Sequence, residues 1–357
     1  MNDYKKVGLV LVNYRDYASR FLVDCRDSLR HQDYPTSSTK IYIVDNASTL
    51  QSEKYLHDIF PEAKILIRPD GNYAAANNLG FLQAINDGCQ YIVTVNMDTV
   101  AQSSWLSALV SALDNNPEAA IAQSKILLFP LPGDNPSPLK INSWGNIFHF
   151  LGFGFTGGYG QPDKVIEGYP VILGYASGCS FIMRASVWQK IGGYNEDFYM
   201  YHDDIEISLK ARLAGYSIVL APDSVIYHKY EFNRSIRMLY YIERNRLLTI
   251  AIFYPIPAII FLLPALLFMQ LGLLAYAAAG GWLKTTLRVY GYFLCPSSYV
   301  KIYKQRRQLK SFRCLSFKSL AAGFSGRIEF QEINNPLLRF IVNPILNIYW
   351  RLVKRIV

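Results

Sequence analysis

The sequence predicts an α/β protein with a mostly parallel sheet flanked by helices, followed by an apolar and basic helical region. Short apolar runs alternate with helical segments over the first third of the chain, as in the βαβ units of parallel sheets. Polar side chains follow three of these runs directly. A long uncharged segment then appears in the C-terminal third, where lysine and arginine are also concentrated.

The strands predicted in the first third are apolar or β-branched almost throughout, which is typical of strands that are covered on both faces. The residues between them show helical spacing or a high alanine content. The predicted strands are 7–12, 41–44, 63–67, 91–95 and 119–124, and the predicted helices include 17–29, 74–86 and 103–115.

The middle of the chain is less regular. Segment 129–138 contains four prolines and is predicted to be irregular. Segment 144–160 is rich in glycine and aromatic residues, which predicts a loop whose flat rings, Trp144 among them, could stack on sugars; ordinary packing of these rings is the alternative. The remaining predicted elements are strands 178–184, 217–220 and 225–228 and a helix within 201–216.

Polar clusters follow three predicted strands and contain Asn13, Asp45 and Asp98. The carboxyl ends of parallel strands share one edge of the sheet, where open α/β sheets bind their ligands. A carboxylate such as Asp98 at this edge can hold Mg²⁺ or Mn²⁺ against a diphosphate, because these ions prefer oxygen ligands and share them with substrate phosphates. The alternative is that Asp98 only caps the following helix.

Charge is distributed unevenly. The net charge is +9, but residues 244–327 contain twelve lysines and arginines and no acidic residue, which leaves 24 basic and 27 acidic residues elsewhere. Basic residues beside apolar ones favour an anionic membrane surface over nucleic acid as the partner. The five cysteines match no zinc or disulfide pattern, so we expect reduced, cytosolic thiols. The apolar run at the N-terminus is too short for a signal peptide, and we expect the N-terminal domain in the cytoplasm.

Segment 247–269 is uncharged and, as a helix, would be about 34 Å long, enough to span a bilayer. Three prolines interrupt it, and a weaker apolar run, 271–282, follows. Basic residues flank both sides, so one crossing would violate the positive-inside rule. We therefore expect a re-entrant or two-helix hairpin over 247–283, or an in-plane helix pair, on the cytoplasmic face of the membrane; a single span and a buried soluble helix are the alternatives.

Five motifs occur in order along the chain. They are VNYR at 12–15, VDNAS at 44–48, GNYAAANNLG at 71–80, NMDT at 96–99 and YHDDIEISLKARLAGY at 201–216. On these motifs the chain resembles the inverting family 2 glycosyltransferases with a GT-A fold, and within that family the rhamnosyltransferase-type and galactofuranosyltransferase-type enzymes. The resemblance covers residues 7 to 248. It implies a GT-A domain at 1–235. Composition and charge, not the resemblance, predict a membrane-associated helical region at 236–330 and an amphipathic C-terminal tail at 331–357.

The resemblance also implies a donor site. Asn13 and Asp45 match positions that contact the nucleotide base and ribose, and Asn77 lies in a segment that approaches the donor. Asp98 matches the last aspartate of the DxD motif, which ligates the metal and the diphosphate. Asn96 stands where the first aspartate often is, so the metal would depend more on Asp98.

His228 matches a position where some members of the family have a histidine metal ligand; a histidine packed at a strand end is the alternative. Asp203 and Asp204 match the family's acidic pair, with Asp204 as the general base and Asp203 on the acceptor side with Trp144. An inverting displacement needs such a base, because the acceptor hydroxyl loses its proton as it attacks. The helix N-terminus is expected to keep the base ionised. A solvated helix start is the alternative, and a glycosidase pair would need two acids on opposite sides of the substrate.

The implied function is metal-dependent transfer of one sugar, with Mg²⁺ or Mn²⁺, from a nucleotide-sugar donor to a polyprenyl-diphosphate-linked saccharide in cell-surface polysaccharide biosynthesis. Rhamnose is suggested by the resemblance alone. The QxxRW motif of processive members is absent from the sequence, which favours transfer of a single sugar. The alternatives are a catalytically inactive, membrane-associated nucleotide-sugar-binding partner, suggested by Asn96, and a sugar-phosphate nucleotidyltransferase, which would need a glycine-rich loop after the first strand.

Overall fold

The computed structural model describes residues 4–130, 138–231, 238–329 and 336–357. The chain forms two compact units. Unit 1 comprises residues 1–146, 156–211 and 216–230, and unit 2 comprises 147–155, 212–215 and 231–357. The boundaries that we predict at 235/236 and 330/331 lie outside the described residues.

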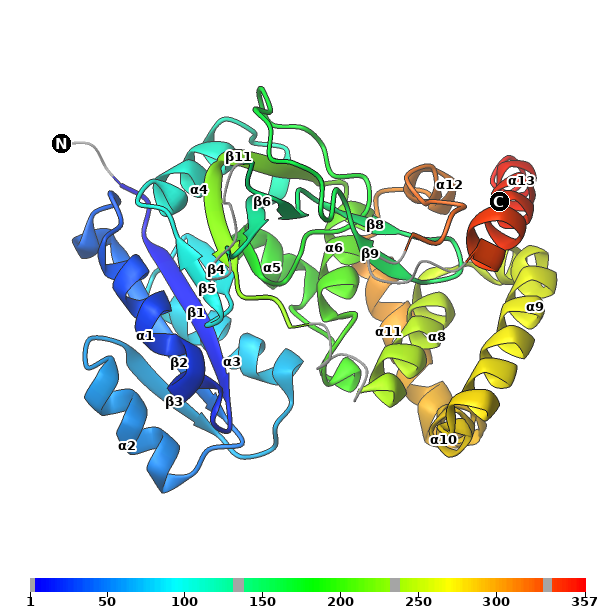
Figure 1. Cartoon of the computed structure of the whole chain (residues 1–357), viewed down its shortest axis with the longest axis horizontal. Helices are drawn as coiled ribbons and strands as arrows, with labels where there is room; N and C mark the ends of the chain where they lie inside the picture. Colours follow the sequence, from blue (N-terminus) through cyan, green and yellow to red (C-terminus); the bar gives the residue numbers. More distant parts are fainter. Residues whose placement is uncertain (1–3, 131–137, 232–237, 330–335) are drawn as a thin grey trace. The chain divides into compact units, whose positions relative to one another are not determined.

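Unit 1 is built on a mostly parallel sheet with the strand order β3-β2-β1-β4-β10-β6-β11-β5, and β7 pairs with β6 (Figure 1). Strands β10, β5 and β7 are antiparallel to their neighbours, and the other pairs are parallel. The strands are β1 (Val7–Tyr14), β2 (Thr39–Asn46), β3 (Lys64–Arg68), β4 (Tyr91–Val95), β5 (Thr99–Ala101), β6 (Ala119–Leu128), β7 (Ile141–Ser143), β10 (Ser180–Arg184) and β11 (Ser217–His228).

Helices cover both faces of this sheet. Alternate side chains of β1, such as Leu9 and Leu11, are buried in one core with α1, α2 and α4. On the other face, α3 packs closely against β1 and β2 because Gly80 has no side chain: a Cβ atom there would lie 2.4 Å from a methyl carbon of Val10. The helices of unit 1 are α1 (Tyr17–Arg30), α2 (Leu50–Ile59), α3 (Tyr73–Asn86), α4 (Trp105–Asp114), α5 (Ala185–Ile191) and α6 (Asp203–Leu213), the last ending at the start of a unit 2 segment.

The predicted α/β class and mostly parallel sheet are confirmed, but several details of the prediction were wrong. Segments 217–220 and 225–228 form one strand, β11, with an irregularity between Ala221 and Val225. The segment 144–160, predicted as a loop, contains the paired strands β8 (Asn146–Phe148) and β9 (Gly154–Thr156). Strand β5 and helix α5 were not predicted, because both are too short for a periodic pattern to show.

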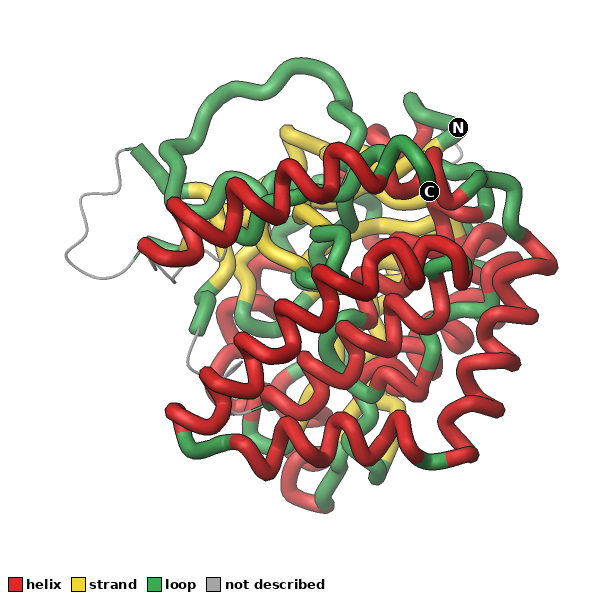
Figure 2. Tube along the Cα trace, turned by 90° about the vertical axis from the view of Figure 1, so that its right-hand side faces the viewer, coloured by secondary structure: helices red, strands yellow, loops and turns green. Residues whose placement is uncertain are grey.

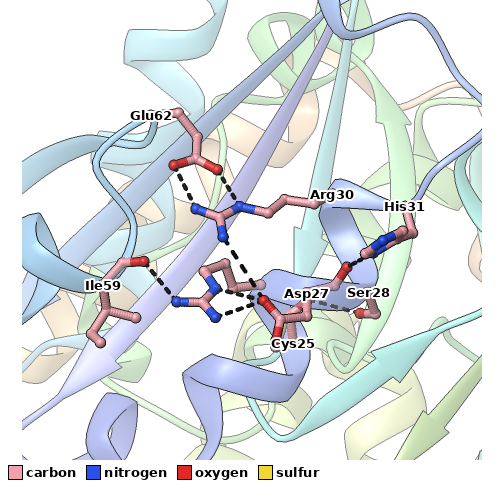
Figure 3. Close-up of polar contacts among 8 residues, drawn as sticks. Cys25, Asp27, Ser28, Arg30, His31, Ile59 and Glu62 are labelled. Carbon is pink, nitrogen blue, oxygen red and sulfur yellow. Dashed lines mark hydrogen bonds and ion pairs between the residues drawn. The ribbon is translucent and has the colours of Figure 1, made fainter.

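A hollow of about 470 Å³ lies at the amino ends of the strands, next to Thr39 and Lys40 at the start of β2. Its rim includes Arg30 of α1, which donates hydrogen bonds of 2.5 and 2.9 Å to the two carboxylate oxygens of Glu62 (Figure 3). None of the residues that line this hollow is a predicted site residue. The predicted residues Asn13 and Asp45 lie at the other end of their strands.

Unit 2 is mainly helical, and Figure 2 shows its helices as red tubes. Its core includes Phe150 stacked on Trp350, with ring centroids 4.9 Å apart, and Phe324 beside both Phe148 and Trp350. The helices are α8 (Leu239–Phe253), α9 (Ile256–Gly280), α10 (Leu283–Leu294), α11 (Pro296–Phe312), α12 (Phe317–Ala321), a π-helix (Leu338–Val342) and α13 (Asn343–Val353).

The two apolar runs predicted at 247–269 and 271–282 do not form two separate helices. Residues 247–253 are the largely buried end of α8, and most of both runs belongs to the single helix α9. Pro255 explains the break, because proline cannot continue α8, whereas Pro257 in the first turn of α9 is tolerated there. Among the described residues, α9 is the one helix long and apolar enough to cross a membrane by length and composition, and 17% of its most apolar 18-residue window is buried.

Candidate active site

Strands β1 and β2 bring Asn13 and Asp45 side by side at their carboxyl ends, where the two residues are direct partners in the parallel ladder. The Asn13 amide donates a 2.7 Å hydrogen bond to one Asp45 oxygen, and the Ser52 hydroxyl donates one of 2.6 Å to the other. The Asn13 oxygen in turn accepts the backbone N–H of Ala18 at the start of α1. Neutral donors therefore fix a buried carboxylate at the edge where we predict the nucleotide.

Asn77 is placed differently from these two residues. It lies inside α3 and is 1% exposed. Its amide donates to the backbone oxygen of Tyr73 at 3.0 Å, and its oxygen accepts the Thr94 hydroxyl at 3.4 Å. The contact with Thr94 ties α3 to β4. Tyr73, one turn earlier in α3, donates from its hydroxyl to the Asn96 side-chain oxygen at 3.2 Å.

Asp98 and His228 meet at the end of the sheet. Nε2 of His228 lies 3.3 Å from Oδ2 of Asp98, and both residues are buried. Strands β11 and β5 create the contact, because their antiparallel register pairs His228 with Thr99. The other ring nitrogen, Nδ1, lies 3.0 Å from the Asn142 side-chain oxygen. Burial by itself would lower the pKa of His228, but the Cys179 sulfur and the Asp98 carboxylate raise it well above its ordinary value.

The Asp98–His228 pair fits a divalent cation that takes few protein ligands. A carboxylate oxygen and an imidazole nitrogen are ligands that Mn²⁺ accepts, and Mg²⁺ and Mn²⁺ usually complete their coordination with water and substrate phosphates. Among the described residues no group of three or more histidine, cysteine, aspartate or glutamate side chains gathers to hold a metal, so the rest of the shell would come from such ligands. The His228 imidazole must be neutral to bind a metal ion, so the cation would compete with a proton for the ring nitrogen.

The acidic pair opens α6, as predicted. Asp203 is the first residue of the helix and is 7% exposed, whereas Asp204 is partly exposed. One oxygen of Asp204 accepts the Gly178 N–H at 3.3 Å, and the other accepts the Ile205 N–H at 2.8 Å. These contacts fix the direction in which the carboxylate points.

The two carboxyl groups have different pKa values for physical reasons. Burial, and then the charge of Asp204, raises the pKa of Asp203 to about 8. Burial also raises the pKa of Asp204, but the two backbone N–H groups stabilise its charge, so its pKa rises only to about 6. The expectation that the helix N-terminus simply keeps Asp204 ionised was incomplete, because burial opposes it. At neutral pH Asp203 is mostly protonated and Asp204 is mostly ionised, which suits a general base.

A short connection before β10 links the acidic pair to the end of β4. Gly178 binds Asp204, and the backbone oxygen of the next residue, Cys179, accepts the Asn96 N–H at 2.9 Å. Asn96 is two residues from Asp98. The Asp204 carboxylate and the backbone of the segment that carries Asp98 are therefore hydrogen-bonded to adjacent residues of this connection.

Backbone strain gathers around these residues. The non-glycine residues with positive φ, counted over the part of the chain that the structure describes, all flank the predicted site: Arg15 follows Asn13, Ala47 follows Asp45, and the others precede Asp203. Such conformations cost about 1–3 kcal/mol each and are typical of functional sites. The residues that precede Asp203 are Tyr199, Tyr201 and His202, with φ of 65°, 63° and 61°.

The ring of Trp144 is less accessible for stacking on a sugar than its residue type suggests. The Lys164 ammonium lies 4.7 Å from the centroid of its ring system, and a Cβ atom on Gly158 would lie 2.4 Å from an indole carbon, so the ring is covered by both residues. It also packs against the small apolar cluster of Leu127, Ile141 and Val225. Its assignment to the acceptor side stays a prediction.

Four residues that bind the predicted side chains were not found by sequence analysis: Ser52, Asn142, Gly178 and Cys179. Ser52 lies seven residues after Asp45 in the first turn of α2, and that spacing could have suggested it. No local signal points to the other three, because the sheet brings them to the site from distant parts of the sequence.

The family model described as "Glycosyl transferase family 2" matches residues 9–192, slightly more than half of the chain. N-acetylglucosaminyl-diphospho-decaprenol L-rhamnosyltransferase of Mycobacterium tuberculosis is 24% identical in an alignment 213 residues long that covers 53% of this chain and 66% of that protein. Uncharacterized protein y4gI of Sinorhizobium fredii is 28% identical over 161 residues, which are 44% of this chain and 17% of that protein. The chain thus spans less than two thirds of the length of either relative.

Among solved structures, GalNAc-T7 with UDP, GalNAc and Mn²⁺ is similar in fold, with a TM-score of 0.55 and 12% identity over 71% of this chain and 48% of that one. This likeness concerns the fold alone. It confirms the GT-A architecture that the motifs imply. The chain therefore belongs to glycosyl transferase family 2, a family of glycosyltransferases, and has the GT-A fold.

Proposed function

We propose that the chain is an inverting, metal-dependent glycosyltransferase that moves one sugar from a nucleotide-sugar donor to a lipid-linked saccharide. The reaction would take place on the cytoplasmic face of the membrane, in cell-surface polysaccharide biosynthesis. The observation that carries this proposal is the placement of Asp204. A partly exposed carboxylate with a pKa near 6 is held by two backbone N–H groups, on the same connection that binds the end of β4.

The chemistry follows from that placement. The acceptor hydroxyl attacks the anomeric carbon of the donor sugar while the bond from that carbon to the diphosphate breaks. Asp204 takes the hydroxyl proton during this step, which makes the oxygen a better nucleophile. Asp203, protonated near neutral pH, adds no second charge beside the base. A single displacement of this kind inverts the configuration at the anomeric carbon.

The donor would bind at the edge formed by Asn13, Asp45 and Asp98, with Asp98 and His228 holding Mg²⁺ or Mn²⁺. The cation, when bound, neutralises the charge of the departing nucleoside diphosphate. Support comes from the contact between Asp98 and His228 and from GalNAc-T7, a fold neighbour whose structure contains UDP and Mn²⁺.

A lipid-linked acceptor is suggested by the name of the mycobacterial relative, which includes a diphospho-decaprenol. The apolar helix α9 and the basic residues around it are consistent with an enzyme that works beside a bilayer. Rhamnose as the transferred sugar follows from that relative alone, so the donor has to be found experimentally.

The test is turnover by the purified, detergent-solubilised full chain. The assay supplies a panel of nucleotide sugars, Mg²⁺ or Mn²⁺, and a polyprenyl-diphosphate-linked sugar, and it measures the release of nucleoside diphosphate and the anomeric configuration of the product. We expect release with one donor, dependence on the cation, and inversion. The variant Asp204→Asn should lose turnover and still bind the donor.

Two results would overturn the proposal. A retained anomeric configuration would exclude a single displacement. Failure of every donor both to react and to bind would favour a catalytically inactive partner protein.

A further inference from the structure

Helix α9 exposes a continuous row of apolar side chains. Its members recur every three or four residues, so they lie on one face of the helix. The exposed fractions reach 63% at Ile260, 56% at Leu267 and 67% at Leu271. Exposed apolar area of this extent is rare on monomeric soluble proteins and marks a surface that contacts something else. The row consists of Ile256, Ile260, Leu263, Leu267 and Leu271.

Three further helices also expose apolar side chains. Helix α13 and the π-helix before it bury Leu346 and Trp350 and expose large apolar side chains on the other side. Helix α13 packs beside α9, where the Tyr349 hydroxyl donates to the backbone oxygen of Phe261, and α10 packs beside α9 as well (Figure 1). We call the exposed apolar side chains of α9, α10, the π-helix and α13 the apolar face; outside α9 they include Leu283, Leu287, Phe340, Ile341, Ile345, Ile348 and Leu352.

The buried side of α9, which borders this row, is tied to polar groups inside unit 2. Gln270, near the middle of α9, donates to the Tyr290 hydroxyl at 3.1 Å, and its oxygen accepts a hydrogen bond from Arg246 of α8. Arg246 is 1% exposed and forms an ion pair with Glu243 at 2.6 Å. Its guanidinium also donates to the backbone oxygen of Leu151 at 2.6 Å.

These contacts bear on how α9 can meet a membrane. A helix of 25 residues is about 37 Å long, so a spanning α9 would carry Gln270 into the bilayer interior. Either the Arg246–Glu243 pair would follow it into hydrocarbon, or the contacts of Gln270 would break. Both options are costly. A helix that exposes apolar side chains and is also bound to polar groups along its buried side is suited to lie along the interface.

We propose that unit 2 docks on an anionic lipid bilayer through the apolar face, with α9, α10 and α13 lying in the plane of the membrane and α9 not crossing it. The choice of a bilayer as the occupant rests on the proposed function, since a lipid-linked acceptor keeps the enzyme at a membrane. Charge complementarity supports it independently. Helix α9 has no charged residue, but the elements that continue the apolar face carry exposed cations: Lys284 and Arg288 on α10, Arg339 on the π-helix, Arg351 on α13 and Arg355 just after it.

The first test is flotation of the full chain with vesicles of phosphatidylcholine alone or with about a third phosphatidylglycerol. We expect binding to the anionic vesicles, weakened by salt because cationic side chains contribute. The double variant Leu267→Glu/Leu271→Glu should bind at least about tenfold more weakly. A matched control, Val23→Glu/Leu82→Glu, changes two residues of unit 1 helices that are 40% and 48% exposed, and should bind like the wild type.

The second test determines whether α9 crosses. Cys295 and Cys314 lie after α9 and are exposed, whereas the other three cysteines are buried. When the protein is added to preformed vesicles, a membrane-impermeant maleimide on the outside should label both exposed thiols as fully as it does after detergent is added. Labelling that needs detergent would show that the chain beyond α9 has crossed, and would overturn the in-plane arrangement.

Other outcomes also decide the matter. Absence of binding to anionic vesicles would overturn the proposal, as would concentration-dependent self-association that the glutamate pair abolishes, because a second copy would then be the occupant. The variant Asp204→Asn should float like the wild type, whatever its activity. Transfer to a short-chain, water-soluble acceptor should survive Leu267→Glu/Leu271→Glu, so failure of docking and failure of the proposed function give different results.

Discussion

The imidazole of His228 contacts the carboxylate of Asp98 at 3.3 Å, although 130 residues separate them in the sequence. The contact exists because β11 and β5 are antiparallel neighbours, so the last residue of β11 lies beside the residue after Asp98. It places a nitrogen and an oxygen ligand together at the end of the sheet, where the proposed function needs a cation.

The first prediction concerns this pair. His228→Ala removes one proposed ligand, and we expect the Mn²⁺ concentration for half-maximal activity to rise by about 10–100-fold, with partial activity at saturating metal. Asp98→Asn should abolish the response to metal, because an amide oxygen is a weaker ligand for hard cations. Binding of Mn²⁺, followed by its electron paramagnetic resonance signal with a nucleoside diphosphate present, should weaken in the same order. Unchanged Mn²⁺ binding in both variants would place the cation elsewhere.

The second prediction concerns the base. Asp204→Asn keeps the size of the side chain and removes its ability to accept a proton, so kcat should fall by about 10²–10⁴-fold while donor affinity stays within a few-fold. In the wild type, kcat/KM should fall as the pH drops through about 6, since the base is protonated below its pKa. A profile that stays flat down to pH 5 would argue against Asp204 in this role.

The third prediction concerns Asp203, whose pKa is raised to about 8 in the folded protein from an ordinary value near 3.9 in an unfolded chain. The folded state therefore binds one more proton than the unfolded state between about pH 4 and pH 8, and this residue lowers the stability as the pH rises through that window. In Asp203→Asn that contribution to the pH dependence should disappear. Urea unfolding at pH 5 and pH 8 measures it.

The same variant provides a contrast with the base. Asparagine resembles the neutral carboxyl group, so activity at pH 7 should fall by less than about tenfold, and the acid limb near pH 6 should remain in place. Loss of activity as complete as in Asp204→Asn would contradict the inference that Asp203 is only a neutral neighbour of the base.

The fourth prediction concerns the ion pair inside α6. The Lys210 ammonium lies 2.6 Å from Glu206, both side chains are 1% exposed, and the ammonium also donates to the Gly193 backbone oxygen. Lys210→Met leaves the Glu206 charge buried without its partner, and we expect a loss of about 3–5 kcal/mol in the free energy of unfolding. The double variant Lys210→Met/Glu206→Leu should recover part of that loss.

The pair of Arg30 and Glu62 is the natural comparison, because its side chains are 39% and 43% exposed (Figure 3). Glu62→Gln should change the free energy of unfolding by less than about 1 kcal/mol, since water screens an exposed pair and replaces its hydrogen bonds. Equal effects of Glu62→Gln and Lys210→Met in chemical denaturation would contradict the role given to burial.

The sequence predicts the local elements well, because the patterns that identify them are local. The apolar runs that predict β1, β2, β3 and β4 require only a few neighbouring residues, and the same holds for the acids that open α6. The clustering of polar residues at the strand ends can also be predicted from the sequence, since parallel strands bring their carboxyl ends to one edge of the sheet. The order of the motifs then identified the family and its fold.

Tertiary structure decided what depends on distant contacts. Only the pairing of β11 with β5 brings His228 to Asp98, and only the connection before β10 links Asp204 to the end of β4. The left-handed conformations of Arg15 and Ala47 are equally invisible in the sequence, because neither is a glycine.

Helix α9 shows most clearly the difference between what the sequence predicts and what the tertiary structure decides. By sequence it is apolar on every side, and the placement of basic residues favoured a hairpin or an in-plane pair without excluding a span or a buried helix. Packing of the chain assigns one side to Gln270, Arg246 and the interior of unit 2 and leaves the other side exposed. The physical reason is that composition determines how much apolar surface a segment has, whereas only its neighbours in space determine which part of that surface is covered.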